Sequence, residues 1–571
     1  MHQNTRMNRL EPFLHRTRIA YFTMEIALRP EMHTYSGGLG VLAGDIARTC
    51  ADLHLPLVFV TLLSRAGYVQ QQIDIQGAQV SQPNVWQAEE WAEQLDTMVA
   101  ATIEGREVWI RPWLYRLTSP LGESVPVLLL DTNVEQNGPM DREITDHLYG
   151  GDESYRFKQE IVLGIGGALV LQALGFNVSH YHLNEGHAAL LTLYLLRQFR
   201  LSAEQIAPGQ TAYEPRYVRE RCLFTTHTPV EAAFDKFSYS LVHRILGDYL
   251  EIDEIKHFGG RDELNMTQLA LNLSGYVNGV SERHAETVKQ IFPGYHVRAI
   301  TNGVHPATWT HPRLATLYQK NLPQWAVEPE VLERADQVPD EAIWNAHQEA
   351  KGDLLALIKR CGGLEMRVDV PLIAFARRMT AYKRPDLIFS DINRLTGIAR
   401  ERPFQIAFAG LAHPRDETGR RLILALHQYI RQLSNTIPMV FLPNYDMAIA
   451  GRLVAGADIW LNTPLAPLEA SGTSGMKAAL NGVLNMSVLD GWWIEGHIEG
   501  VTGWAIGNGK LDGSRNQAND LYDKLGHTVL PLYYHDRMRW IWMMKQSISK
   551  IGSYFNTHRM MRRYATEAYL R

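Results

Sequence analysis

The chain has 571 residues, of which 46% are hydrophobic and 20% charged, with 44 glycines and 26 prolines. This composition excludes disorder, collagen-like repeats and a coiled coil, and the length predicts two to four domains of roughly 100–200 residues. The 56 Lys and Arg against 61 Asp and Glu give a net charge of −5. The surface as a whole therefore does not favour nucleic acid or anionic lipid, and any anion site must be local.

Three cysteines, Cys50, Cys222 and Cys361, stand far apart, which argues against a disulfide framework or a Cys-based zinc site and suits a reducing cytosol. The N-terminus is polar and lacks an apolar signal core. The apolar run 161–176 is too short to cross a bilayer comfortably, so we expect a buried helix there. These features predict a soluble cytoplasmic protein without a membrane partner.

Short, continuous apolar runs alternate with helical patterns along the chain. The runs expected to be strands are 19–25, 55–63, 125–132, 178–184, 222–228 and 297–304 in the first part, and 370–379, 404–410, 439–445, 457–463 and 482–490 in the second. Continuous rather than alternating runs indicate strands covered on both faces, and therefore parallel sheets flanked by helices.

A polar stretch without strand signals separates the two series of strands. We expect an N-terminal α/β lobe at 1–315, a helical connector at 316–368, a C-terminal α/β lobe at 369–532, and C-terminal helices at 533–571 that pack back on the N-terminal lobe. The predicted fold class is α/β, with two doubly wound lobes and a cleft between them.

Three segments combine small or charged residues with the ends of predicted strands. In Ser-Gly-Gly-Leu-Gly at 36–40, glycines allow backbone N–H groups to approach an anion at a helix N-terminus, although a simple tight turn explains the segment equally well. In 376–385, Arg377, Arg378, Lys383 and Arg384 follow a buried strand. A solvated charged face is the alternative there, but the position beside the strand favours phosphate binding.

The most informative segment is 467–482. Glu469 precedes a Ser/Gly/Thr loop at 471–475, and a helix then begins with Lys477 near its first turn. A small-residue loop before a helix N-terminus can hold an anion. A lysine is unfavourable at this end of the helix dipole, which suggests that it pairs with a phosphate or forms an imine.

Polar side chains also follow other predicted strands, at positions that border one cleft. They are Asn184, Glu185, His187, His227, Asn302, Asn444 and Tyr445. His182, Glu185 and His187 do not have the i, i+4 spacing of helix-borne zinc ligands, so hydrogen bonding is favoured over a metal.

From about residue 19 to residue 507, these ordered motifs resemble the pyridoxal-phosphate-dependent α-glucan phosphorylases, and in particular their shorter bacterial and archaeal branch. The motifs include YFTME, SGGLG, HLNEGH, ITNGVHPATW, ARRMTAYKR, EASGTSGMKAALNG and LDGWW. The resemblance implies the two-lobe GT-B glycosyltransferase architecture. It also implies reversible phosphorolysis, in which orthophosphate removes a terminal α-1,4-linked glucose from a maltodextrin or glycogen-type glucan as α-glucose 1-phosphate, with retention.

The resemblance implies a role for each matching residue. Lys477 matches the lysine that binds pyridoxal phosphate covalently. The cofactor cradle would comprise Gly472, Thr473, Ser474 and Gly475, together with Trp309 and Asn302. Catalysis would involve Lys477, Arg378, Lys383, His227 and Glu469, with Arg378 and Lys383 binding the substrate phosphate. Substrate would be bound by Gly37, Gly38, Glu185, His187, His227, Asn302, Tyr382, Tyr445, Glu469 and Ser471.

The sequence departs from the larger enzymes of this family at several positions. Arg377 replaces Lys, Thr380 replaces His, Glu185 and Gly186 replace an Asp–Thr pair, and Ser474 and Gly475 replace Gly–Asn. The N-terminal portion that carries regulation in the animal enzymes is absent, and whether the chain forms a homo-oligomer stays open.

Two other readings remain. A nucleotide-sugar-dependent glucosyltransferase of the glycogen synthase type shares the fold, but many retaining members of that group carry a second Glu where this chain has Lys477. A non-catalytic glucan-binding homologue is the other, and the changes at Thr380 and Glu185 leave it open.

Overall fold

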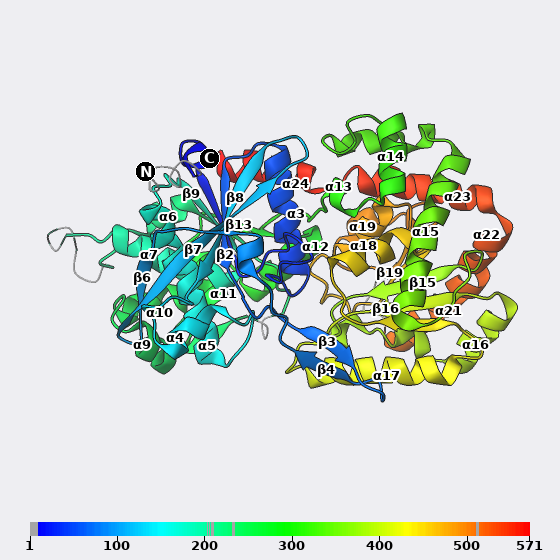
Figure 1. The fold of residues 1–571 in the computed structure, drawn as a ribbon, viewed down its shortest axis with the longest axis horizontal. Coiled ribbons are helices and arrows are strands. Elements are labelled where there is room, and N and C mark those ends of the chain that lie inside the picture. The colour runs from blue at the N-terminus through cyan, green and yellow to red at the C-terminus, as the bar shows by residue number, and fades with distance from the viewer. Residues whose placement is uncertain are drawn as a thin grey trace.

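The computed structural model describes residues 10–202, 204, 206, 211–230, 234–509 and 513–570. Within them, two large sheets lie in different parts of the chain, each accompanied by helices (Figure 1). The first sheet has ten strands in the order β14-β13-β10-β9-β1-β2-β8-β7-β5, with β6 paired to β7. Its strands are β1 (Ile19–Thr23), β2 (Leu57–Leu62), β5 (Glu93–Gln94), β6 (Val99–Ile103), β7 (Arg106–Thr118), β8 (Ser124–Asp131), β9 (His180–Asn184), β10 (Cys222–Thr225), β13 (Tyr276–Gly279) and β14 (Arg298–Ala299).

The second sheet has six strands, all parallel, in the order β17-β16-β15-β18-β19-β20. They are β15 (Leu372–Ala376), β16 (Gln405–Ala409), β17 (Met439–Leu442), β18 (Ile459–Asn462), β19 (Leu484–Val488) and β20 (Gly503–Ile506). Two small antiparallel pairs complete the described strands, β3 (Gln70–Ile73) with β4 (Gln79–Gln82) and β11 (Lys236–Ser238) with β12 (Glu263–Asn265).

The α-helices that accompany the sheets follow in chain order. Up to the end of the first sheet they are α2 (Glu11–Leu14), α3 (Gly38–Asp52), α4 (Pro139–Arg142), α5 (Glu153–Ile161), α6 (Gly167–Ala173), α7 (Leu190–Gln198), α8 (Pro215–Arg221), α9 (Tyr239–Leu246), α10 (Ile252–Gly259), α11 (Met266–Asn272) and α12 (Glu282–Ile291). Those that follow are α13 (Pro306–Trp309), α14 (Pro312–Asn321), α15 (Asp340–Gly362), α16 (Ile392–Glu401), α17 (Glu417–Leu433), α18 (Met447–Gly456), α19 (Ser474–Leu480), α20 (Trp493–Gly496), α21 (Ser514–Lys524), α22 (Leu530–His535), α23 (Arg537–Ser547) and α24 (Thr557–Tyr564).

The parallel α/β class predicted from the continuous apolar runs is confirmed. Strands β1, β2, β10, β15, β16 and β18 are buried along their whole length. The first sheet differs from the expectation at one edge, where β7 pairs antiparallel with β8, β5 and β6. The prediction missed β7 because its burial is partly alternating, as in a sheet with one covered face.

The expected strand at 297–304 is wrong in length, because only Arg298–Ala299 pairs with β13. Beyond that edge strand the chain leaves the sheet toward α13. The apolar run 161–176 is helical up to Ala173, as expected for most of its length, and Val162–Gly166 within it forms a wide π-helical turn that is buried. In the described part of the chain, no helix has both the length and the apolar character needed to span a membrane.

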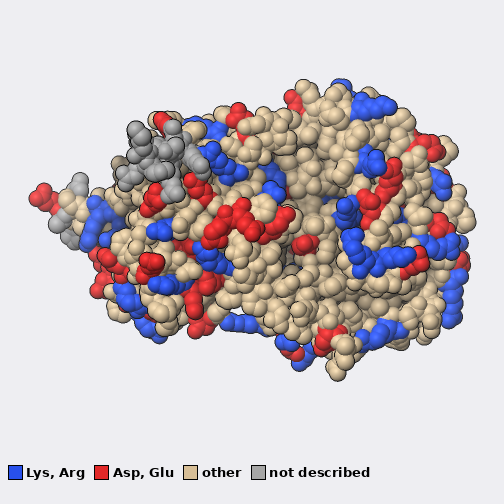
Figure 2. Space-filling view, viewed as in Figure 1, with Lys and Arg blue, Asp and Glu red and all other residues tan. Residues whose placement is uncertain are grey.

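The C-terminal helices divide between the two sheets. Trp540 and Met544 of α23 join the hydrophobic core around the second sheet, whereas Met560 and Tyr564 of α24 join a core that includes α3 and β1. Of the described part of the expected tail, the residues from α24 onward join the core beside the first sheet, and Phe555 and Asn556 before it contact Val304. On the face drawn in Figure 2, acidic and basic side chains are interspersed rather than separated into fields of one sign.

Candidate active site

A buried group of opposite charges lies after β15. The Arg377 guanidinium donates to Glu469 Oε2 at 2.5 Å, and the Lys383 ammonium donates to the same oxygen at 2.6 Å. Burial by itself would raise the pKa of Glu469, but these two cations lower it to about 2. The carboxylate is therefore ionised, and one Arg377 nitrogen, Nη1, is buried without a hydrogen-bond partner among the described residues.

The neighbouring arginines separate into two roles. No hydrogen bond or ion pair joins the exposed Arg378 guanidinium to any described residue, and it lies near Glu25, Tyr68 and Tyr149. Arg384 points away and binds the carbonyl oxygens of Thr463 and Pro464. The expectation that all four cations gather for an anion is thus wrong for Arg384, which anchors a loop.

The glycine turn precedes α3, and a carboxylate holds it. Glu25 Oε2 accepts the backbone N–H groups of Ser36 at 2.6 Å and Gly37 at 3.0 Å, while Glu25 Oε1 accepts the Tyr149 hydroxyl at 3.0 Å. The Gly37 amide is therefore engaged within the protein. A Cβ added at Gly37 or Gly38 would meet nothing within 4 Å, so the space beside the helix N-terminus is open.

Lys477 projects from α19 into a buried site without a counter-ion contact. Its ammonium lies 3.8 Å from the centre of the Trp309 ring, and the structure gives it no hydrogen bond or ion pair among the described residues. Trp309 Nε1 donates to Asp45 Oδ2 at 2.8 Å. Burial lowers the pKa of Lys477 to about 8, although the nearby Asp45 raises it in part.

The loop at 471–475 connects Lys477 to the charged group after β15. Gly472 has a φ of +75°, and a Cβ there would lie 3.6 Å from Arg377 Nη2 and 3.6 Å from Glu469 Cδ. Ser474 Oγ accepts the Trp460 indole N–H at 3.0 Å. The hydroxyl of Thr473, at the start of α19, caps no backbone N–H. Ser471 is buried, and its hydroxyl turns to the Gly472 carbonyl.

The polar residues after β9 and β10 form one network at the carboxyl edge of the first sheet. Glu185 Oε2 accepts the backbone N–H of His227 at 2.7 Å, and the His227 Nε2 contacts Asn184 Oδ1 at 2.6 Å. Burial lowers the pKa of His227 to about 3, so this imidazole is neutral. Glu185 itself has a φ of +73°, a strained value for a residue with a Cβ, of the kind that clusters at functional sites.

His187 lies near His227, with its Nε2 3.3 Å from Asp235 Oδ2. His182 does not face the site, because its ring nitrogens contact the hydroxyls of Tyr569 and Thr225 at 2.8 Å each. The hydrogen-bonding role favoured for these histidines agrees with this arrangement.

The remaining predicted residues lie at the borders of these groups. Tyr445 is half-buried beside Arg377 and Tyr35, and the Tyr382 ring lies 4.5 Å from the Lys383 ammonium. Asn302 is buried, and its backbone N–H donates to the Val280 carbonyl at 3.1 Å. Among the described residues, its side-chain amide has no hydrogen bond.

Sequence reasoning missed Glu25 and Asp45, the two carboxylates that hold the glycine turn and the Trp309 ring. Both lie inside or beside apolar runs, where a buried carboxylate without an obvious partner is itself a signal. It also missed a compact group of Asp52, His305 and His558, whose donor atoms lie within 4.8 Å of one another. His305 Nδ1 lies 2.7 Å from the Thr308 hydroxyl, and its Nε2 lies 2.8 Å from Asp52 Oδ2.

Comparison with known proteins assigns this arrangement to a class. Residues 253–502 match the family model described as carbohydrate phosphorylase. Over 96% of its length, the chain is 39% identical to a maltodextrin phosphorylase of Thermococcus litoralis, of which it covers 70%. A glycogen phosphorylase of Aquifex aeolicus is 35% identical over 96% of the chain and 86% of the relative. A glycogen phosphorylase of Mycobacterium tuberculosis is 33% identical over 97% of the chain and 71% of the relative.

These similarities define an enzyme of the glycosyltransferase-type phosphorylases. The chain belongs to the carbohydrate phosphorylase family.

Proposed function

We propose that this chain is an α-glucan phosphorylase that uses pyridoxal 5′-phosphate and catalyses reversible phosphorolysis of terminal α-1,4-linked glucose to α-glucose 1-phosphate. The observation that carries the proposal is the buried amine of Lys477, which contacts the Trp309 ring and has no hydrogen bond or ion pair among the described residues. The Arg378 guanidinium, after β15, likewise has no hydrogen bond or ion pair to a described residue. A protein seldom leaves a buried cation without a partner, because desolvation is costly unless a ligand compensates it. The maltodextrin and glycogen phosphorylases among the relatives support the same substrates.

The proposed architecture is GT-B, with the active site in a cleft between an N-terminal lobe at 1–315 and a C-terminal lobe at 369–532. Two separate sheets with parallel centres support it. The candidate residues lie after strands of both sheets, at the carboxyl edges where open α/β sheets bind ligands.

The residues around Lys477 fit pyridoxal phosphate. A pKa near 8 leaves a substantial fraction of the amine neutral at neutral to alkaline pH, as covalent attachment to an aldehyde requires. The cofactor phosphate would lie in the loop of Gly472, Thr473, Ser474 and Gly475, beside the N-terminus of α19. Trp309 and Asn302 would border the ring. When bound, the cofactor would supply a phosphate group able to exchange a proton with the substrate phosphate.

The protein's own groups would bind and orient the substrates. Arg378, the free Nη1 of Arg377 and Lys383 would hold orthophosphate, with the N-terminus of α3 at Gly37 and Gly38 opposite. These cations would reduce the repulsion between two neighbouring phosphates and stabilise the charge that develops as the glucosyl bond breaks. Glu469 would keep Arg377 and Lys383 in place.

The glucosyl unit would be bound from the first sheet and from the neighbouring loops. His227 and Glu185 would contribute hydrogen bonds, with His187, Asn302, Tyr382, Tyr445, Ser471 and Glu469 completing the site. Neutral His227 is suited to hydrogen bonding with a sugar hydroxyl and not to pairing with phosphate.

The test is a set of assays on the purified protein. We expect a bound pyridoxal chromophore that is lost in Lys477→Ala, and release of glucose 1-phosphate from maltodextrin only when orthophosphate is present. Glucosyl transfer from a nucleotide-glucose without phosphate would instead support the synthase-type alternative. Maltodextrin binding with neither activity would support a non-catalytic homologue.

A further inference from the structure

The β3–β4 hairpin (residues 70–82) is a separate antiparallel pair that contacts α17 and the loop after β16 of the second sheet. In Figure 1 it extends below the first sheet and reaches α17, while α13 and α24 lie at the opposite side of the molecule, where the chain crosses between the halves. At the tip, Gly77 lies against His427 of α17, and Arg431 donates to the Gln76 carbonyl at 2.9 Å. Nothing in the proposed reaction uses this hairpin directly.

Two buried glutamines make the main polar contacts. Gln71 and Gln79 are each 2% exposed, although glutamine is usually a surface residue. Gln71 Nε2 donates to the Gly410 carbonyl at 2.9 Å. Gln79 exchanges two hydrogen bonds with Ala412, since its Nε2 donates to the carbonyl at 2.8 Å and its Oε1 accepts the N–H at 3.0 Å.

The segment 409–412 is held from both sides. The backbone N–H of Arg377 donates to the Ala409 carbonyl at 3.2 Å, and that of Met379 donates to the Leu411 carbonyl at 2.8 Å. Residues 410 and 412 face the glutamines, and residues 409 and 411 face the backbone around Arg378. A displacement of the hairpin would therefore be transmitted to the arginines through one layer of backbone.

Gln71 also binds Asn444, the residue before Tyr445, through two hydrogen bonds. The Gln71 backbone N–H donates to Asn444 Oδ1 at 2.7 Å, and the Asn444 backbone N–H donates to Gln71 Oε1 at 2.9 Å. Asn444 has a φ of +57°, a left-handed conformation that asparagine tolerates better than most residues. This reciprocal pair fixes the backbone directly before Tyr445.

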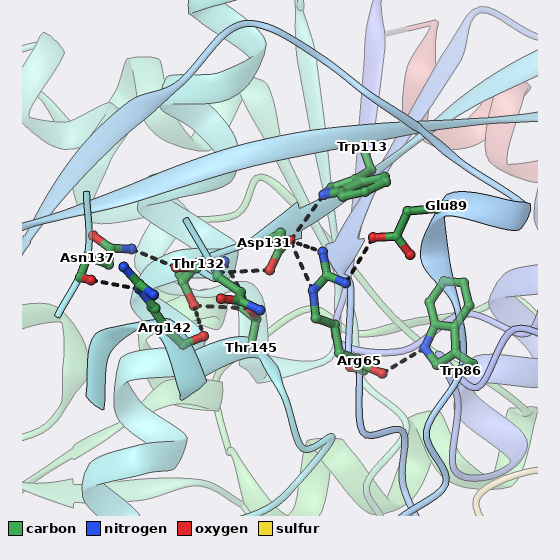
Figure 3. A network of polar contacts seen from close by, with 11 residues as sticks. Arg65, Trp86, Glu89, Trp113, Asp131, Thr132, Asn137, Arg142 and Thr145 are labelled. Carbon is green, nitrogen blue, oxygen red and sulfur yellow. Dashed lines mark hydrogen bonds and ion pairs between the residues drawn. The ribbon is translucent and has the colours of Figure 1, made fainter. Parts of the chain in front are cut away.

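The base of the hairpin is anchored to the first sheet (Figure 3). Arg65, before β3, pairs with the fully buried Asp131 at 2.7 Å, and Asp131 also accepts the Trp113 indole N–H at 3.1 Å. Trp86, after β4, donates its indole N–H to the Ser64 carbonyl at 2.8 Å. The hairpin is therefore hydrogen-bonded at its base to the first sheet and, farther along, to α17 and to Gly410 and Ala412 after β16.

We propose that Gln71 and Gln79 are positioning residues that hold Arg377 and Arg378 at a set distance from the glycine turn, and so determine the affinity for orthophosphate. The inference rests on the proposed function. It also specifies which substrate depends on the hairpin, because the glutamines contact the arginine side of the site and not the network around His227.

The experiment compares Gln71→Leu and Gln79→Leu with Gln72→Ala, in the holoenzyme. Gln72 lies on the exposed face of the same strand and serves as the matched control. We expect the KM for orthophosphate to rise at least tenfold in both leucine variants, with the KM for maltodextrin within threefold of wild type and the bound cofactor unchanged. Gln72→Ala should match wild type in both constants.

Two further measurements separate positioning from general damage. Asn444→Asp keeps the acceptor for the Gln71 N–H and should retain the phosphate KM, whereas Asn444→Ala should raise it. Hydrogen exchange in residues 409–412 should be faster in Gln79→Leu than in Gln72→Ala. Equal phosphate KM values in wild type and both leucine variants would overturn the inference. A wild-type protein that lacks phosphorolysis would overturn the proposed function instead, while faster exchange at 409–412 would still support the structural connection.

Discussion

At the scale of single residues, the central feature is a lysine whose surroundings favour its neutral form. Lys477, in α19, is 7% exposed, and its ammonium lies over the Trp309 ring. Desolvation disfavours the ammonium more than the nearby Asp45 carboxylate favours it, so the pKa falls from 10.5 to about 8. This amine is therefore far more nucleophilic near neutrality than a surface lysine.

The pH dependence of cofactor uptake tests this property. Because the neutral amine is the reactive form and predominates only above its pKa, we expect uptake of pyridoxal phosphate by the apoenzyme to accelerate with rising pH and to level off above about pH 8. Stopped-flow absorbance between pH 6 and 9.5 measures the rate, and Lys477→Arg is the control that should show no covalent uptake. A rate still rising steeply between pH 9 and pH 9.5 would contradict the lowered pKa.

The glycine turn allows a second prediction at this scale. Gly37→Ala places a methyl group in open space at a backbone φ of −161°, which any residue adopts, so the melting temperature should stay within about 2 °C of wild type. If orthophosphate occupies that space, kcat/KM for phosphate should fall at least tenfold, or about 1.4 kcal/mol. Gly352→Ala, which also enters open space but lies on α15, should leave the kinetics unchanged.

At the scale of elements, α15 is joined to the second sheet by a buried ionic group. Lys351 and Asp458 are fully buried, with the ammonium 2.6 Å from Asp458 Oδ2. His347 contacts the other carboxylate oxygen at 2.9 Å, and the Leu372 backbone N–H donates to Oδ2 at 2.7 Å. α15, which lies within the expected connector, is thus packed on the second sheet, and the Lys351 and Asp458 charges pair only when α15 lies beside β18.

Removing one partner should be strongly destabilising. Lys351→Met leaves the Asp458 carboxylate buried without its cation, so we expect a loss of about 3–5 kcal/mol in unfolding free energy. Lys359→Met on the same helix, whose pair with Glu365 is exposed, should change stability by less than about 1 kcal/mol. Urea unfolding measures the free energy of unfolding of both variants. Equal decreases in the two variants would show that the buried Lys351–Asp458 pair contributes no more than the exposed Lys359–Glu365 pair.

At the scale of the whole molecule, the Asp52 carboxylate connects α24 to the first sheet's side of the protein. Three side chains contact this carboxylate. Asp52, at the end of α3, accepts from His305 at 2.8 Å and Ser119 at 2.5 Å, and lies 3.3 Å from the His558 Nε2 of α24. Burial would raise the pKa of Asp52, but the two histidines and the serine hold it well below its usual range. The group joins residues that are hundreds of positions apart.

A carboxylate with a depressed pKa stabilises the folded state above its unfolded pKa of about 3.9 and loses this contribution as pH falls. We therefore expect the difference in melting temperature between wild type and Asp52→Asn to be largest near pH 6–7 and to shrink below about pH 4. Calorimetry at several pH values measures it. A difference that is constant from pH 7 to pH 3.5 would contradict the assignment.

The sequence alone determined the parallel α/β class, the positions of most central strands and the residues that follow them. These features depend on local apolar runs and on the rule that parallel strands present their carboxyl ends at one edge. Lys477, Arg378 and Glu469 could be singled out for that reason, and the family resemblance that they carry is confirmed.

Only the tertiary structure decided which of these charges have partners. Three contacts join segments that share no local pattern. Glu25 binds the glycine turn at Ser36, Arg384 binds the Thr463 carbonyl, and Gln71 binds Asn444. The same holds for α24, where Thr557 meets Thr49 across 508 positions. Hydrogen bonds and desolvation depend on distance in space, and periodicity along a chain does not encode the distance between residues so far apart.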